Sequence, residues 1–172
     1  DSSQSRGLGD VYKRQYPSHS IGKSLVSLVT GYAMCGGYIN HTVYDRIDYP
    51  TVVGTLYENQ KLIDLLHMTA GDDPYIGHAK YRKDNAWMGK GPNTNTIPIK
   101  KVMKRYFKGK EGITPGVNYN YSALTTNVIM NYVIYKTGDD WNKLLHKIFV
   151  EDAKVARSCL LYTSDAADDS GC

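Results

Sequence analysis

Ser20 and Lys23 have the residue types and the spacing that covalent catalysis requires, because they form a Ser-x-x-Lys motif, Ser20-Ile21-Gly22-Lys23. Residues three apart on a helix share one face, so the lysine amine can lie beside the serine hydroxyl. A serine hydroxyl is a weak nucleophile until a base takes its proton, and a lysine amine serves as that base when burial or nearby positive charge lowers its pKa. The motif therefore predicts a nucleophile and its base at a helix N-terminus, where the helix dipole and a backbone N–H favour negative charge.

Two further segments follow this motif. The motif opens the stretch SIGKSLVSLVTG at residues 20–31, which is followed by KLIDLLHMTAG at residues 61–71 and by TPGVNYNYSA at residues 114–123. The three segments, spread over most of residues 16–149, resemble the superfamily of active-site serine hydrolases that contains the class C β-lactamases and the penicillin-binding proteins. Taken alone, the motif has a simpler interpretation, in which Ser20 caps a helix and Lys23 is solvated.

The resemblance implies an α/β (α+β) fold of the β-lactamase/transpeptidase type, in which a mainly helical region packs against a sheet. We expect this chain to be mainly helical, with the flanking sheet strands largely missing. The resemblance also implies roles for individual residues, each of which needs the others within hydrogen-bond reach. Ser20 would be the acylated nucleophile, Lys23 its proton acceptor and Tyr121 the acid/base that protonates the leaving group. Ser122 and Ala123 fall at positions that bind substrate.

The function implied by the resemblance is a serine hydrolase that cleaves an amide or an ester through an acyl-enzyme on Ser20, without a cofactor or a metal. Its substrate would be a small molecule or peptide-like, as in the branch of 6-aminohexanoate-dimer hydrolases and esterases. Many relatives carry an asparagine where this chain has Ala123, which argues against β-lactamase activity. Two alternatives stay open: a D,D-peptidase or β-lactamase acting on cell-wall peptides or β-lactams, and a non-catalytic binding paralogue. The resemblance suggests a periplasmic or secreted protein, with the cytoplasm as the alternative.

Lys136-Thr137-Gly138 matches a further sequence box of the family. It lies only 15 residues past Tyr121 and at the end of a helical pattern, so we interpret it as a helix C-terminus. Substrate contacts from the true box would then come from outside this chain.

Several other patterns have a structural interpretation that we favour over a functional one. A basic cluster could attract nucleic acid, but we interpret it as the solvated face of a helix and predict no nucleic-acid partner. Cys35, in an apolar run, is predicted to be buried, and Asp72 and Asp73 to form a solvated turn rather than a site for a cation or a substrate amine. The basic cluster consists of Lys100, Lys101, Lys104, Arg105, Lys108 and Lys110. Four of the five histidines lack the spacing of metal ligands, namely His41, His67, His78 and His146.

Composition is that of an ordinary globular domain. The 172 residues are 41% hydrophobic and 11% aromatic, with a net charge of +4, which argues against disorder. No apolar stretch approaches the roughly 18 residues of a membrane span. Residues 10–15 (DVYKRQ) and 159–164 (CLLYTS) resemble translations, from opposite strands, of a transposon mosaic end used in sequencing adapters. We therefore predict that residues 1–15 and 158–172 are non-native and that residues 16–157 are a fragment of the hydrolase domain, inactive and marginally folded by itself.

Hydrophobic spacing predicts five helices around these motifs. The first begins at Ser20, buries one apolar face and ends at Gly36-Gly37. Residues 38–55 read as a loop with one short extended piece, after which Asn59 is predicted to cap a helix to about Thr69. Residues 72–116 are irregular apart from a helix at 98–107, and two helices follow at 122–137 and from Asp139 or Asp140 to residue 149. The predicted buried face of the first helix comprises Ile21, Leu25, Leu28, Val29 and Tyr32.

Overall fold

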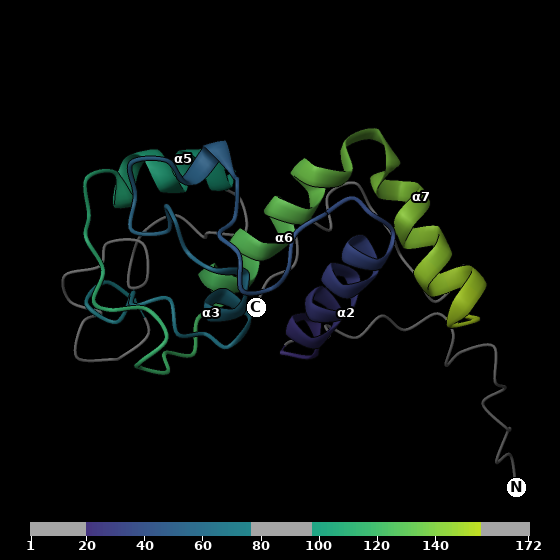
Figure 1. Cartoon of the computed structure of the whole chain (residues 1–172), viewed down its shortest axis with the longest axis horizontal. Coiled ribbons are helices and arrows are strands. Elements are labelled where there is room, and N and C mark those ends of the chain that lie inside the picture. The colour runs from purple at the N-terminus through teal and green to yellow at the C-terminus, as the bar shows by residue number, and fades with distance from the viewer. Residues whose placement is uncertain (1–19, 77–97, 156–172) are drawn as a thin grey trace, which may run out of the picture.

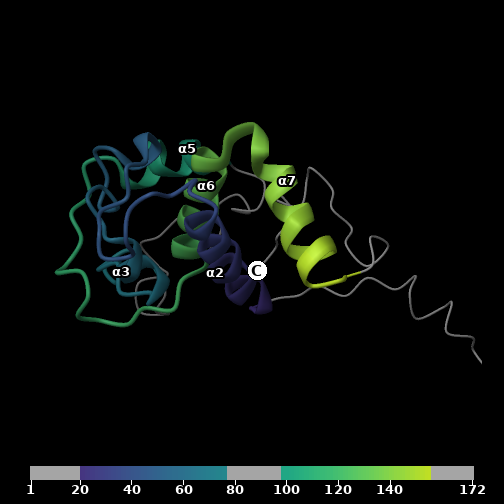
Figure 2. The same cartoon turned by 45° about the vertical axis from the view of Figure 1, so that its right-hand side comes forward.

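The computed structural model describes residues 20–76 and 98–155, and within these ranges the chain is mainly helical without a β-strand (Figures 1 and 2). The mainly helical character that we predicted is thus confirmed for these ranges. The described ranges contain two isolated antiparallel β-bridges, one between Arg46 and Lys61 and one between Thr55 and Lys108. The ends predicted to be non-native, 1–15 and 158–172, lie outside the described residues. The helices are α2 (Ile21–Cys35), α3 (Leu62–Leu66), α5 (Ile99–Val102), α6 (Ala123–Thr137) and α7 (Trp141–Leu145), with π-helical turns at Met103–Phe107 and His146–Asp152 and 3-10 turns at Pro50–Val52 and Gly138–Asp140.

α6 is the central element of the fold, since it packs against α2, α3, α5 and α7 (Figure 1). It begins and ends where the sequence predicts, with Ser122 at the N-cap and Gly138 at the C-cap. Lys136 and Thr137 form its last turn, so the interpretation of Lys136-Thr137-Gly138 as a helix C-terminus is confirmed. Apolar side chains of α6 are buried and join the elements into one core; they include Leu124, Val128, Ile129, Tyr132 and Val133.

α2 has two apolar faces, and the prediction of which one is buried was wrong in part. Val29 is buried and Tyr32 is half-buried, as predicted, but Ile21, Leu25 and Leu28 are 66%, 38% and 43% exposed. The face that packs against α6 instead carries small and β-branched side chains, Val26, Val29, Thr30 and Ala33. Short side chains allow two helices to approach closely, and this contact decides which face is buried. Cys35, at the end of α2, is exposed, so its predicted burial was also wrong.

The start of α3 differs from the prediction. Asn59 has a left-handed φ of 63° and forms a turn, which asparagine tolerates, and α3 begins only after Lys61. Met68, with φ of 57°, prevents the helix from reaching Thr69. The helix predicted at 98–107 is confirmed as α5 and the π-helical turn after it. The last helix is also confirmed, although Asp140 makes no side-chain capping bond to it.

Backbone hydrogen bonds join residues 68–71 to residues 113–120. Asn120 N–H donates to Met68 O, and Gly116 N–H donates to Thr69 O, both at 2.8 Å; Ile113 N–H donates to Gly71 O at 2.9 Å. Gly71 has φ of 71°, and a Cβ there would lie 2.0 Å from Ile113 O, so only glycine fits. The two segments that carry the second and third parts of the family resemblance are therefore in direct contact.

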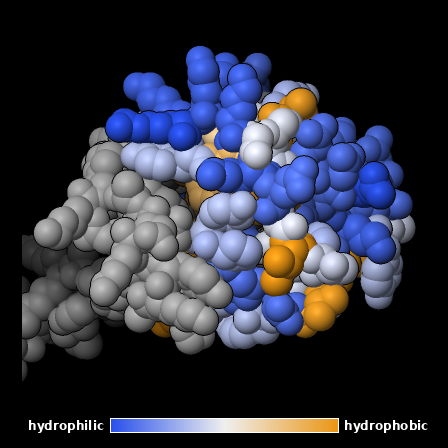
Figure 3. Space-filling view, turned by 90° about the vertical axis from the view of Figure 1, so that its left-hand side faces the viewer, coloured by the Kyte–Doolittle hydropathy of each residue, from blue (hydrophilic) through white to orange (hydrophobic). Residues whose placement is uncertain are grey.

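The face of the molecule on which α5 lies is largely hydrophilic (Figure 3). The cationic side chains of the basic cluster are all exposed, whereas Val102, Met103 and Phe107 on the other side of the same turns are buried. This arrangement agrees with the interpretation as a solvated helix face. Among the described residues, none of the helices is long and apolar enough to cross a membrane.

Candidate active site

Ser20 and Tyr121 meet at the N-terminus of α2. The Tyr121 hydroxyl donates a hydrogen bond to Ser20 Oγ at 2.6 Å, across 101 positions of the sequence. Ser20 occupies the N-cap position of α2, but its side chain makes no capping bond, so the simpler interpretation of this serine does not describe its contacts. The first turn of α2 contains no acidic residue. The positive end of the helix dipole, which lies beside the Ser20 hydroxyl, is therefore not neutralised by a carboxylate of the same turn.

The Lys23 side chain contacts the ring of the same tyrosine. Its Nζ is 4.8 Å from the centroid of the Tyr121 ring, within the range of a cation–π contact, and its side chain is partly buried. Tyr121 itself is 50% exposed, so the group is open to solvent and to a substrate. The three residues that the sequence singles out for covalent chemistry are therefore neighbours.

Ser122 and Ala123, the predicted substrate-binding positions, form the beginning of α6. The Ser122 hydroxyl accepts a hydrogen bond from Thr125 N–H at 3.3 Å and is 2% exposed, so it caps the helix. Ala123 is partly buried and is the first helical residue. Both positions adjoin Tyr121, but the capping bond already uses the Ser122 hydroxyl.

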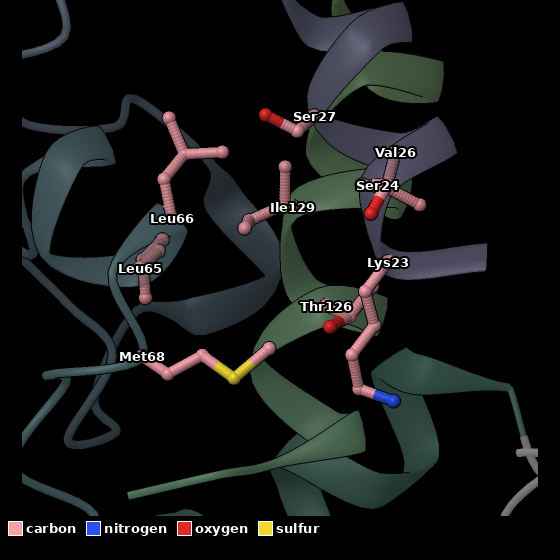
Figure 4. Close-up of a pocket in the computed structure, with 9 residues that line it drawn as sticks. All are labelled: Lys23, Ser24, Val26, Ser27, Leu65, Leu66, Met68, Thr126 and Ile129. Carbon is pink, nitrogen blue, oxygen red and sulfur yellow. The ribbon is translucent and has the colours of Figure 1, made fainter. Parts of the chain in front are cut away.

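A cavity of about 220 Å³ opens beside Lys23, between α2, α3 and α6. Figure 4 shows the Lys23 side chain extending along one side of it, with Met68 reaching in from the turn after α3 and Ile129 from α6. The wall combines apolar side chains, mainly from α3 and the turn after it, with hydroxyl groups from α2 and α6. The sequence alone gave no indication of this cavity. Its lining is completed by Ser24, Val26, Ser27, Leu65, Leu66 and Thr126.

Asp72 is fully buried, so the prediction of a solvated turn was wrong for this residue. Its carboxylate accepts hydrogen bonds from the Tyr57 hydroxyl and from Asn120 Nδ2, both at 2.7 Å, and from Thr125 Oγ1 at 3.2 Å. The pKa of Asp72 is raised, chiefly by burial and further by the charge of Asp73, although the three donors act in the opposite direction. Burial also raises the pKa of Tyr57 well above its ordinary value, and the charge of Asp72 adds to that rise.

A second polar cluster lies toward the other end of α6. The Tyr132 hydroxyl lies 2.6 Å from His41 Nε2 and donates to Asp48 Oδ1 at 2.8 Å, while Lys136 Nζ donates to Asp48 Oδ2 at 2.8 Å. Burial raises the pKa of Asp48, but the bonds from Lys136 and Tyr132 outweigh it and lower the pKa overall. This cluster ties the loop after α2 to α6.

Metal ligation finds no support in the part of the chain that the structure describes, where no group of three His, Cys, Asp or Glu side chains converges. His78 falls outside the described residues. Comparison of the chain with family models, with curated proteins and with solved structures finds no match.

Proposed function

We propose that this chain carries the active site of a serine hydrolase, which cleaves an amide or an ester through an acyl-enzyme on Ser20. The observation that carries the proposal is the 2.6 Å hydrogen bond from the Tyr121 hydroxyl to Ser20 Oγ, with Lys23 placed over the same ring. The helical region would belong to an α+β fold of the β-lactamase/transpeptidase type.

The three side chains suffice for a balanced acyl transfer. With Lys23 in its neutral amine form, Ser20 Oγ attacks the carbonyl carbon of the substrate while its proton passes to Lys23 Nζ, which becomes the ammonium ion. The carbonyl oxygen takes the negative charge, which the positive end of α2 stabilises. When the C–N or C–O bond breaks, the leaving atom takes a proton from the Tyr121 hydroxyl, and Lys23 returns a proton to Tyr121. Water then cleaves the acyl ester by the reverse proton transfers and restores Ser20.

The surroundings of the site favour a simple amide or ester over a β-lactam. Ala123 offers no side-chain amide to a substrate, and the cavity beside Lys23 has an apolar part formed by α3, Met68 and Ile129. A small apolar group of the substrate would fill such a cavity by the hydrophobic effect. A D,D-peptidase or β-lactamase activity and a purely binding role are the alternatives, and the orientation of Tyr121 toward Ser20 favours catalysis over binding alone.

The experiment is covalent labelling with a fluorophosphonate. The labelling rate measures how strongly the base activates the serine hydroxyl, and it does not require turnover of a substrate. Formation of the Oγ–P bond releases fluoride, and the serine proton goes to the base. Peptide mapping should place the added mass on Ser20, and S20A should abolish it. Y121F and K23M should slow labelling at least tenfold, because each removes one of the contacts described above.

Matched control variants are available. Y119F removes the hydroxyl of a tyrosine that is 66% exposed and two residues away, and K104M removes an exposed lysine of the basic cluster. Neither should change the labelling rate. Absence of any Ser20 adduct between pH 6 and 10, both in the folded chain and in the complete protein if the chain is a fragment, would refute the proposed function. Retention of the full rate in Y121F would remove the role of Tyr121.

A further inference from the structure

We propose that Asp72 is a positioning residue, which holds Tyr121 in the orientation that points its hydroxyl at Ser20. The catalytic importance of this positioning rests on the proposed function. The Asp72 carboxylate binds side chains on both sides of Tyr121: Asn120, the preceding residue, and Thr125, in the first turn of α6. One buried carboxylate thus fixes the chain just before and just after the tyrosine.

Asn120 is held firmly enough to transmit this constraint. Its side-chain Nδ2 donates to Asp72 Oδ1 at 2.7 Å and to Ile76 O at 2.9 Å, and its backbone N–H donates to Met68 O at 2.8 Å. It is 6% exposed, whereas the next residue, Tyr121, is 50% exposed. The orientation of the exposed ring is therefore set by the buried residue beside it.

Thr125 constrains the other side. Its hydroxyl donates to Asp72 Oδ2, and its backbone N–H donates to Ser122 Oγ at 3.3 Å. Ser122 directly follows Tyr121, so the capping bond and the Asp72 contact together fix where α6 begins. A shift of this first turn would move the tyrosine away from Ser20.

Asp72 is itself fixed in place. Tyr57, which is fully buried, donates its hydroxyl to Asp72 Oδ2 at 2.7 Å. The backbone carbonyl of Asp72 accepts from Tyr75 N–H at 2.9 Å and from Ile76 N–H at 3.0 Å, which forms a turn. A buried carboxylate is unfavourable unless it is well hydrogen-bonded, and here three side-chain donors surround it. The donors include both flanks of Tyr121, which a purely structural carboxylate would not require.

The test compares two threonines of α6 that differ in their partner. T125V removes a buried hydroxyl that binds Asp72, and T137V removes a buried hydroxyl that binds only backbone carbonyls of α6 itself. D72N keeps the shape of the side chain but presents an NH2 group to at least one of the donors around it. Each variant is measured by fluorophosphonate labelling of Ser20, by the fluorine NMR signal of a fluorotyrosine placed at position 121, and by urea unfolding.

We expect T125V and D72N to slow the labelling of Ser20 about tenfold and to shift or broaden the fluorine signal. T137V should lose stability comparable to T125V while leaving both readouts unchanged. The proposal is overturned if folded T125V labels at the parent rate with an unchanged fluorine signal, or if T137V slows labelling as much as T125V. T125V decides alone when D72N does not fold. If the parent chain is not labelled at all but the fluorine signal moves in T125V, the proposed function fails while the positioning of Tyr121 by Asp72 stands.

Discussion

Replacing Gly71 by alanine should destabilise the chain far more than alanine at Gly31 or Gly37, where a Cβ has open space. Gly71 has a left-handed backbone, and adding a Cβ in that conformation costs about 1–2 kcal/mol. The new Cβ would also lie 2.0 Å from Ile113 O, a backbone atom that cannot move independently. Separating the two segments breaks the Ile113 N–H bond to Gly71 O, which adds about 1–3 kcal/mol for buried groups. The expected loss is roughly 3 kcal/mol in total, a large part of the stability of an ordinary domain.

Two other glycines separate the contributions to this loss. Gly37 also has a left-handed backbone, with φ of 76°, but a Cβ there meets nothing within 4 Å, so G37A should lose only about 1 kcal/mol. Gly31 lies within α2 with open space around it, so G31A should gain about 1 kcal/mol from helix propensity. Urea unfolding followed by circular dichroism gives all three values. A loss for G71A within 0.5 kcal/mol of that for G37A would refute the steric reasoning. G71A should also slow the labelling of Ser20, because residues 68–71 pair with the segment that leads to Tyr121.

Three further changes test other features of the fold. Y132F removes a buried hydroxyl with two side-chain partners and should lower the unfolding free energy by about 1–2 kcal/mol, whereas Y135F, on the exposed side of α6, should change it little; equal urea midpoints would contradict this. Burial raises the pKa of Asp72, so the folded state binds a proton more tightly than the unfolded chain, and stability should fall as pH rises from about 3.8 through the raised pKa. D72N should lack this fall, and a stability difference between parent and D72N that does not vary with pH would contradict the assignment. In a chain whose other two cysteines are replaced by serine, Cys35 should react with a thiol reagent without unfolding; protection until unfolding would contradict its exposure.

The sequence predicts the local features of the fold well. The helices at 21–35, 99–107 and 123–137 follow from apolar spacing and from the capping residues Ser122 and Gly138, which act within one helix. The neighbourhood of Ser20, Lys23 and Tyr121 is anticipated by the family resemblance and not by periodicity, because no local rule links positions 20 and 121.

The errors concern contacts between distant segments. The sequence around Asp72 predicts a solvated turn, because its hydrogen-bond donors come from residues 57, 120 and 125, which are distant in the sequence. The two apolar faces of α2 are both plausible cores from spacing alone, and packing against α6 selects one. Asn59 has the residue type of a helix cap, yet it adopts a left-handed turn two positions before the N-cap residue, Lys61. For Asp72 and α2, the deciding interaction is absent from the local sequence.

The hydrogen bond between Ser20 and Tyr121 also has a consequence for folding kinetics. Its partners are separated by 101 positions, so closing that loop is entropically costly and the contact depends on the segments between being in place. Nucleophilicity at Ser20 should thus be absent from any partly folded species that contains only local helices. Recovery of Ser20 reactivity during refolding would then report completion of the whole chain topology, later than the recovery of helical circular dichroism.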